Sequence, residues 1–119
     1  MSPGPFSLSL AVQDLSASRA FYEALGFAPL PPSGEDGAWA LYGTKWLMVG
    51  TDSVVIGLFE QMIEVNTLTF NPADLRGLVG RAKAAGVQFL VEPEGEEGPA
   101  QAVAVDPDGN ALLFDQLDG

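Results

Sequence analysis

The alternation of apolar and polar positions predicts the first elements of the chain. Residues 6–12, FSLSLAV, alternate along their length, which is typical of a strand with one buried face. Asp14 then stands where a helix N-cap belongs, and LSASRAFYEAL carries apolar side chains at helical spacing. Gly26 ends the predicted helix, and residues 27–30 begin the next strand. The pattern therefore predicts strand, helix and strand over residues 6–30.

The same order of elements returns 60 residues later. This shift aligns SLSL at 7–10 with TLTF at 67–70, and it aligns Asp14 with Asp74. Further strand-like segments follow in both halves, at residues 39–42, 46–49, 54–59, 101–105 and 112–114. A repeat of this length is too short to bury its own sheet face, so two copies complete one structure. We expect a single domain over residues 1–119, with repeats over about 5–60 and about 64–117.

The repeat predicts an α+β fold class. Two βαβββ repeats would form a curved mixed sheet with the helices on one face. The positions expected to contact the helices are Leu8, Leu10, Leu68, Phe70, Leu112 and Phe114. The positions expected on the opposite, concave face are Ser7, Ser9, Thr67, Thr69, Leu113 and Asp115. The hydroxyl side chains on this face indicate either a wet, ligand-facing wall or an exposed sheet face, and both alternatives stay open.

A tight acidic turn, DPDGN at residues 106–110, leads into the apolar strand ALLF. Pro107 fixes φ at the start of the bend, and Gly109 and Asn110 are residues that accept positive φ. The strand that follows has no acidic side chain before Asp115.

Charge and composition exclude several partners and several kinds of chemistry. The chain has 16 acidic and 5 basic residues, a formal net charge of −11 and a pI of about 4.1. It would repel nucleic-acid phosphates and anionic lipids, so we expect neither nucleic acid nor membrane as a partner. The start MSPGPF lacks the features of a secretion signal, so we expect a cytoplasmic protein. Cysteine and histidine are absent, which removes thiolate chemistry and the commonest general base and metal ligand.

The stretches SLSLAVQDLSASRAFYEALGF and DPDGNALLFDQ resemble the vicinal oxygen chelate superfamily. This superfamily includes glyoxalase I, extradiol dioxygenases, fosfomycin resistance enzymes and bleomycin-binding proteins. The stretch IGLFEQMIEVNTLTFNP is similar to small single-module members described as glyoxalase- or bleomycin-resistance-like. The resemblance extends from Phe6 to Gln116 and implies the glyoxalase/bleomycin resistance fold. It leaves the activity open, because one fold hosts many unrelated reactions.

The resemblance also implies four metal-ligand positions, one on each of four strands. Metal-dependent relatives carry His, Gln or Glu there, and in this chain the positions fall on Ser7, Gly57, Thr67 and Leu113. None of these supplies the imidazole, carboxylate or thiolate that a transition-metal site requires. A slip of one residue brings only other non-ligands, namely Phe6, Leu8, Leu58, Leu112 and Phe114. We therefore expect neither a metal nor another cofactor.

Bleomycin-type relatives keep the cavity without an ion and use aromatic and acidic side chains at the interface of a homodimer. The resemblance therefore implies a homodimer that binds a small neutral or cationic aromatic molecule. Glu60 and Asp115 are possible anionic contacts. The candidate ligand-binding residues are Ser7, Ser9, Trp39, Trp46, Phe59, Thr67, Thr69, Leu113 and Asp115.

Two other functions stay open. A glyoxalase-type lyase or isomerase, with an atypical metal site or none, would need a general base among Glu60, Glu64 and Asp115 with a pKa raised by burial. A structural or regulatory dimer would instead fill its cavity with Trp39, Trp46 and Phe59, since large aromatic side chains are usually buried. The acidic segment 92–97 is expected to be a mobile loop near the cavity mouth.

Overall fold

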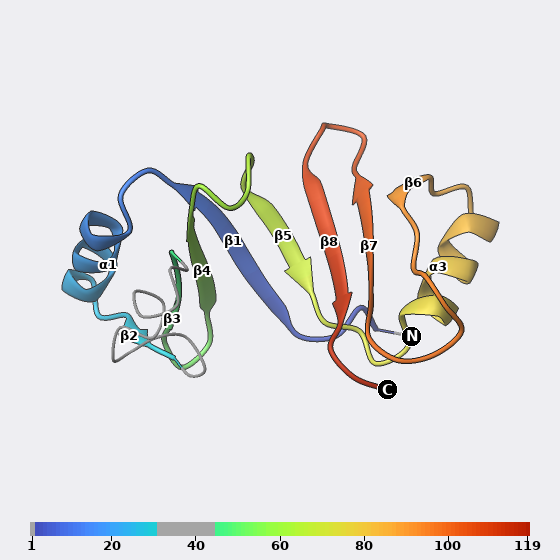
Figure 1. The fold of residues 1–119 in the computed structure, drawn as a ribbon, viewed down its shortest axis with the longest axis horizontal. Coiled ribbons are helices and arrows are strands. Elements are labelled where there is room, and N and C mark those ends of the chain that lie inside the picture. The colour runs from blue at the N-terminus through green and yellow to red at the C-terminus, as the bar shows by residue number, and fades with distance from the viewer. Residues whose placement is uncertain (1, 31–44) are drawn as a thin grey trace. The chain divides into compact units, whose positions relative to one another are not determined.

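The computed structural model describes residues 2–30 and 45–119 (Figure 1). The chain forms two compact units, a first unit of Ser7–Asn66 and a second unit of Thr67–Gly119 together with Met1–Phe6. The strand predicted over residues 39–42, and with it Trp39, lies outside the described residues. Each unit has its own helix and its own core.

Among its described residues, the first unit has one helix and four strands. Along the chain these are β1 (Phe6–Val12), α1 (Leu15–Ala24), β2 (Ala28–Pro29), β3 (Trp46–Gly50) and β4 (Val55–Glu60). The strands lie in the order β2-β3-β4-β1. β1 runs parallel to β4, and β3 runs antiparallel to β2 and β4. The chain order of the unit is therefore βαβββ.

The second unit repeats this plan. Its elements are β5 (Thr67–Phe70), α3 (Leu75–Ala84), β6 (Phe89–Val91), β7 (Ala100–Val105) and β8 (Ala111–Gln116). The strands lie in the order β5-β8-β7-β6, with β5 parallel to β8 and β7 antiparallel to its neighbours. Its sheet matches that of the first unit strand for strand. The predicted α+β fold with two βαβββ repeats is confirmed.

Each helix buries apolar side chains against one face of its own sheet, α1 near β3 and β4 and α3 near β7 and β8 (Figure 1). The first core consists of Leu15, Leu47, Val49, Ile56 and Leu58, and the second of Leu75, Val79 and Ala102. The predicted helix-facing positions Leu8, Leu10 and Phe114 pack against these cores. Burying one such leucine contributes roughly 1.5–3 kcal/mol.

Both helices begin with the same two contacts. The predicted N-caps are confirmed, since Asp14 accepts from the backbone N–H of Ala17 at 3.1 Å and Asp74 from that of Gly77 at 3.0 Å. A second acceptor comes from the last strand of each repeat. Glu60 Oε1 accepts from Leu15 N at 2.8 Å, and Gln116 Oε1 accepts from Leu75 N at 2.7 Å. Since the first N–H groups of a helix lack partners within it, these contacts tie each helix to its sheet.

The acidic turn closes differently from the prediction. Gly109 has φ 91°, as expected, but Asn110 is not at positive φ. Asn110 instead donates from its side chain and its backbone N–H to the Asp106 carboxylate, both at 2.8 Å. These bonds, the side-chain bond first, lower the pKa of Asp106. The turn is therefore organised around an ionised carboxylate.

The acidic segment after β6 is anchored rather than the mobile loop expected from its sequence. The Arg76 guanidinium, on α3, donates to the backbone carbonyls of Glu94, Gly95, Glu97 and Gly98 at 2.6, 3.0, 3.2 and 3.0 Å. The planar fork of donors suits such a ring of carbonyls. Arg76 therefore holds residues 94–98 against the helix.

Candidate functional site

The sheet face of the first unit that points away from α1 carries aromatic side chains beside hydroxyls. Because the core takes Leu47 and Leu58, strand alternation places their neighbours on the opposite face. In the β3–β4 register Trp46 lies opposite Phe59 and Met48 opposite Gly57, and in the β1–β4 register Ser9 lies opposite Gly57. We call this set the aromatic face; its members are Ser7, Ser9, Trp46, Met48, Gly57 and Phe59.

A stacked ring pair forms the centre of the aromatic face. The rings of Trp46 and Phe59 have centroids 6.2 Å apart and an interplanar angle of 14°. A Cβ atom at Gly57 would come within 2.5 Å of Phe59 Cε2 and 2.9 Å of Met48 Sδ. The Phe59 ring and the Met48 thioether therefore occupy the space above Gly57. A glutamate at this position, as in metal-dependent relatives, would have to displace them.

Several hydroxyls of the predicted concave face are buried. Ser7 and Ser9 are each 8% exposed and Thr69 is 9% exposed, while Thr67 is half-buried. Buried hydroxyls need hydrogen-bond partners, in contrast to hydroxyls on an open sheet face. The sequence left open a wet, ligand-facing wall or an exposed sheet face. The low exposure of Ser7, Ser9 and Thr69 does not fit an exposed sheet face.

The corresponding face of the second unit is polar. Register places Thr69 opposite Leu113, and Leu113 opposite Val103. Asp115 lies opposite Gln101. These two residues occupy the positions that Phe59 and Trp46, respectively, occupy in the first unit. We call this set the polar face; its members are Thr67, Thr69, Gln101, Leu113 and Asp115. The repeat thus carries rings in one unit and a carboxylate with a carboxamide in the other.

The predicted site residues therefore divide between two faces. Ser7, Ser9, Trp46 and Phe59 lie together on the aromatic face, and Thr67, Thr69, Leu113 and Asp115 lie together on the polar face. Met48 and Gln101 belong to these faces but were not among the predicted residues. Their place follows from the pairing of β3 with β4 and of β7 with β8, which the 60-residue shift does not give.

The four metal-ligand positions that the family resemblance implies do not fit a metal. Ser7, Thr67 and Leu113 offer no strong donor, and the space at Gly57 is taken by Phe59 and Met48. Within the described part of the chain, no group of three or more His, Cys, Asp or Glu side chains could hold an ion. Over the same residues, no helix has the length and apolar character to cross a membrane.

Glu60 contacts a helix start and a lysine, and these contacts do not fit the general base with a pKa raised by burial that the sequence left open. Besides the bond to Leu15, its Oε2 lies 3.1 Å from Lys45 Nζ, and its side chain is 14% exposed. The Leu15 N–H, and then the Lys45 ammonium, lower the pKa of Glu60. A base raised by burial would need the opposite shift. Asp115 remains on the polar face, and its backbone carbonyl accepts from Asn71 Nδ2 at 2.9 Å.

Comparison with known proteins supports the fold. The family model described as the glyoxalase/bleomycin resistance protein/dioxygenase superfamily matches residues 5–114. A superfamily member of this description from Vibrio splendidus 12B01 has 18% identity and a TM-score of 0.65 over 94% of this chain and 97% of its own. A Streptomyces coelicolor methylmalonyl-CoA epimerase has 20% identity and a TM-score of 0.65 over 98% and 99%.

A third solved structure, described as an NAD-dependent benzaldehyde dehydrogenase from Legionella pneumophila, has 21% identity. Its TM-score is 0.67, over 95% of this chain and 99% of its own. Comparison with curated proteins gives no match. At these identities the structural likeness shows a shared fold and leaves the activity open.

Proposed function

The chain belongs to the glyoxalase/bleomycin resistance protein/dioxygenase superfamily, and on this premise we propose that it is a metal-free binding protein for a small neutral or cationic aromatic molecule. We also propose that it acts as a homodimer, as bleomycin-type relatives do. The observation that carries the proposal is the Trp46–Phe59 pair stacked above Gly57.

The aromatic face has the chemistry of a binding surface for flat molecules. Trp46, Met48 and Phe59 are all half-buried, so part of each remains accessible. Offset aromatic pairs add about 0.5–1.5 kcal/mol beyond area burial, and a cation over a Trp ring gains a similar amount. The net charge of −11 raises the local concentration of cations over anions. Asp115 on the polar face is a further candidate contact for a cationic group.

Calorimetric titration with bleomycin and with ethidium, two cationic aromatic compounds, tests the proposal. We expect saturable binding that Trp46→Ala and Phe59→Ala each weaken by about tenfold, the upper range of one ring contact. Phe21→Ala is the matched control, because Phe21 is a 60% exposed ring on α1 and lies outside the aromatic face. Absence of binding heat from both compounds, or an equal loss in all three variants, would contradict the proposal.

A lyase or isomerase is the second candidate. It is favoured by the likeness of fold to the methylmalonyl-CoA epimerase of Streptomyces coelicolor. Elemental analysis of the purified chain tests the metal-dependent form of this candidate. A metal-free binding protein would contain only traces of divalent ions, whereas one ion per chain would favour the enzyme.

A further inference from the structure

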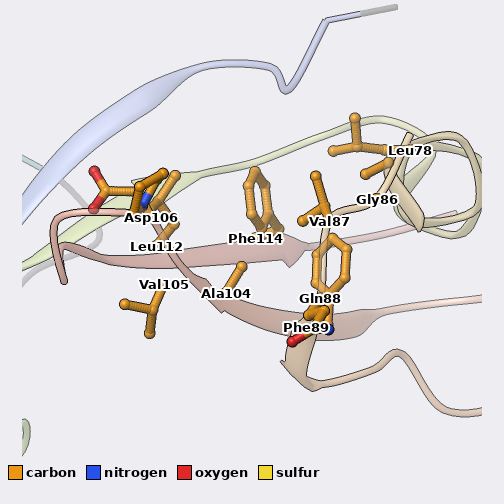
Figure 2. Close-up of a pocket in the computed structure, with 12 residues that line it drawn as sticks. Leu78, Gly86, Val87, Gln88, Phe89, Ala104, Val105, Asp106, Leu112 and Phe114 are labelled. Atoms are coloured by element: carbon orange, nitrogen blue, oxygen red, sulfur yellow. The ribbon is translucent and has the colours of Figure 1, made fainter. Parts of the chain in front are cut away.

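The second unit contains an apolar pocket on the helix side of its sheet (Figure 2). It has a volume of about 560 Å³ and lies between α3, the segment that enters β6, and strands β7 and β8. Its walls include Leu78, Ala82, Val87, Ala104, Leu112 and Phe114. None of the predicted ligand-binding residues lines this pocket. It therefore lies apart from both the aromatic face and the polar face.

The pocket arises where the helix side of the second repeat has smaller side chains than that of the first. The 60-residue shift aligns Tyr22 with Ala82 and Phe27 with Val87. In the first unit the rings of Tyr22 and Phe27 pack edge to face at 5.3 Å and contact the core. In the second unit their counterparts are short and line the pocket.

The sheet floor shows the same reduction. Strand register places Ala102 at the position of Leu47 and Ala104 at the position of Val49. Leu47 and Val49 are both fully buried in the first core, at 0% exposure. Four large side chains of the first repeat thus have small counterparts in the second. At these four places the second repeat therefore has less side-chain volume than the described part of the first.

The lining of the pocket favours an uncharged occupant. Leu112, Phe114 and Ala104 point to the same side of the sheet, toward Val87 and Leu78 (Figure 2). Phe89 adds a ring edge to face with Phe114 at 6.3 Å. Asp106 stands at one end, but its carboxylate already accepts from Asp108 N and twice from Asn110. The nearby Lys83 ammonium pairs with Glu92 at 2.8 Å.

We propose that this pocket is a second ligand site, which takes a neutral apolar molecule containing a ring. Its volume lies within the roughly 300–1,000 Å³ of small-molecule sites, and apolar lining is their usual character. An apolar cavity gives water too few polar partners to be held well, so a hydrocarbon ligand gains by filling it. The net negative charge of the chain disfavours an anionic ligand. The nearby Lys83 does not offset this, because its ammonium pairs with Glu92. The site does not depend on the function proposed for the aromatic face.

Titration of the full chain with N-phenyl-1-naphthylamine, a neutral fluorophore whose emission rises outside water, tests this site. Because a neutral ring compound can also bind the aromatic face, we expect one molecule per chain to remain bound when Trp46→Ala removes a ring of that face. Ala82→Tyr combined with Ala104→Val copies the side chains of the first unit, and it should weaken binding at least tenfold by filling the pocket. In the Trp46→Ala background the pocket variants should weaken the remaining binding to the same extent, because the pocket shares no residue with the aromatic face.

A second variant keeps the test decisive if the double variant does not fold. Val87→Phe copies Phe27 at a position that is 43% exposed, so the core does not have to accommodate the ring. It should also weaken binding at least tenfold while circular dichroism shows the folded signal. The site would be overturned if the unaltered chain bound no probe, or if Trp46→Ala lost the binding and Val87→Phe kept it. It would also be overturned if sedimentation showed a dimer whose interface covers the pocket and which the probe merely dissociates.

Discussion

Glu60 and Gln116 hold the same place in the two repeats but differ in charge. Each accepts from the first backbone N–H of its helix, Glu60 as a carboxylate and Gln116 as a carboxamide. The carboxylate also pairs with Lys45 and faces the positive end of the helix dipole. Only the contact made by Glu60 therefore depends on protonation.

We expect Glu60→Gln to remove this pH dependence. The folded state lowers the pKa of Glu60 below its usual 4.5, so its stabilising effect is complete above that value. The effect is lost as pH falls through the lowered pKa. Glu60→Gln should therefore be less stable than the unaltered chain near neutral pH, and the gap in urea midpoint should narrow at acid pH.

Glu23→Gln is the control for this comparison. It breaks the exposed pair of Arg19 and Glu23, at 3.1 Å, whose contribution is small. Its urea midpoint should stay close to that of the unaltered chain. A gap for Glu60→Gln that keeps its size down to the lowest pH would contradict the assigned role of the carboxylate.

The sequence predicts residues whose role is local and misses those whose role is set by tertiary structure. Asp14 and Asp74 could be placed at helix starts because a cap bonds to a backbone group three residues away. Glu60 bonds to Leu15, which is 45 residues away in the sequence, so no local pattern predicts this contact. The Phe59 ring covers Gly57 only once strand alternation has placed them on one face.

Among the elements, α3 is joined to the segment between β6 and β7 by two side chains, Lys83, which pairs with Glu92, and Arg76. Arg76 donates to four backbone carbonyls there, which leaves the acidic side chains of the segment exposed. Hydrogen bonds from a charged donor contribute about 1.5–3 kcal/mol each when formed well, and less when exposed. The order of the segment therefore depends on Arg76.

Arg76→Ala should release this segment while the rest of the unit stays folded. A loss of about 1.4 kcal/mol in the free energy of local opening makes cleavage by a Glu-specific protease about tenfold faster at Glu94, Glu96 and Glu97. Arg76→Lys keeps the charge but lacks the planar fork of donors, so it should give an intermediate rate. Equal cleavage of all three proteins would show that Arg76 does not hold the segment.

At the scale of the elements the sequence was most informative where the pattern was regular. Strands β1 and β5 and both helices follow from alternation, caps and the 60-residue shift. The pocket beside α3 could not be predicted in this way, because it depends on which residues of β3 and β7 occupy the same place. Only the register shows that Leu47 and Val49 correspond to alanines.

For the whole molecule, the excess of acidic side chains is a source of self-repulsion. The net charge of −11 is carried by a chain of 119 residues. At 0.1 M salt the Debye length is about 10 Å, and repulsion between charges farther apart than this is largely screened. The folded state concentrates this charge more than the unfolded state does, so screening favours folding.

We therefore expect the melting temperature to rise by about 2–5 °C between low salt and roughly 0.3 M sodium chloride, a gain of about 1 kcal/mol or less. Replacing both Glu96 and Glu97 by lysine should reduce this salt effect, because it lowers the net negative charge without touching their backbone carbonyls. Differential scanning calorimetry of the two proteins at matched ionic strengths provides the measurement. A melting temperature that falls with salt would show that attractive ion pairs outweigh the repulsion.

The ring above Gly57 makes this position hard to convert into the metal ligand that the family resemblance implies there. A single change of Gly57 to glutamate would set its Cβ within 2.5 Å of the Phe59 ring, so the ring must first leave its stack with Trp46. The new carboxylate would then still have only Ser7, Thr67 and Leu113 as companions at the other ligand positions. A metal site at these positions would therefore require several substitutions, and the first of them would disturb the ring stack without supplying an ion site.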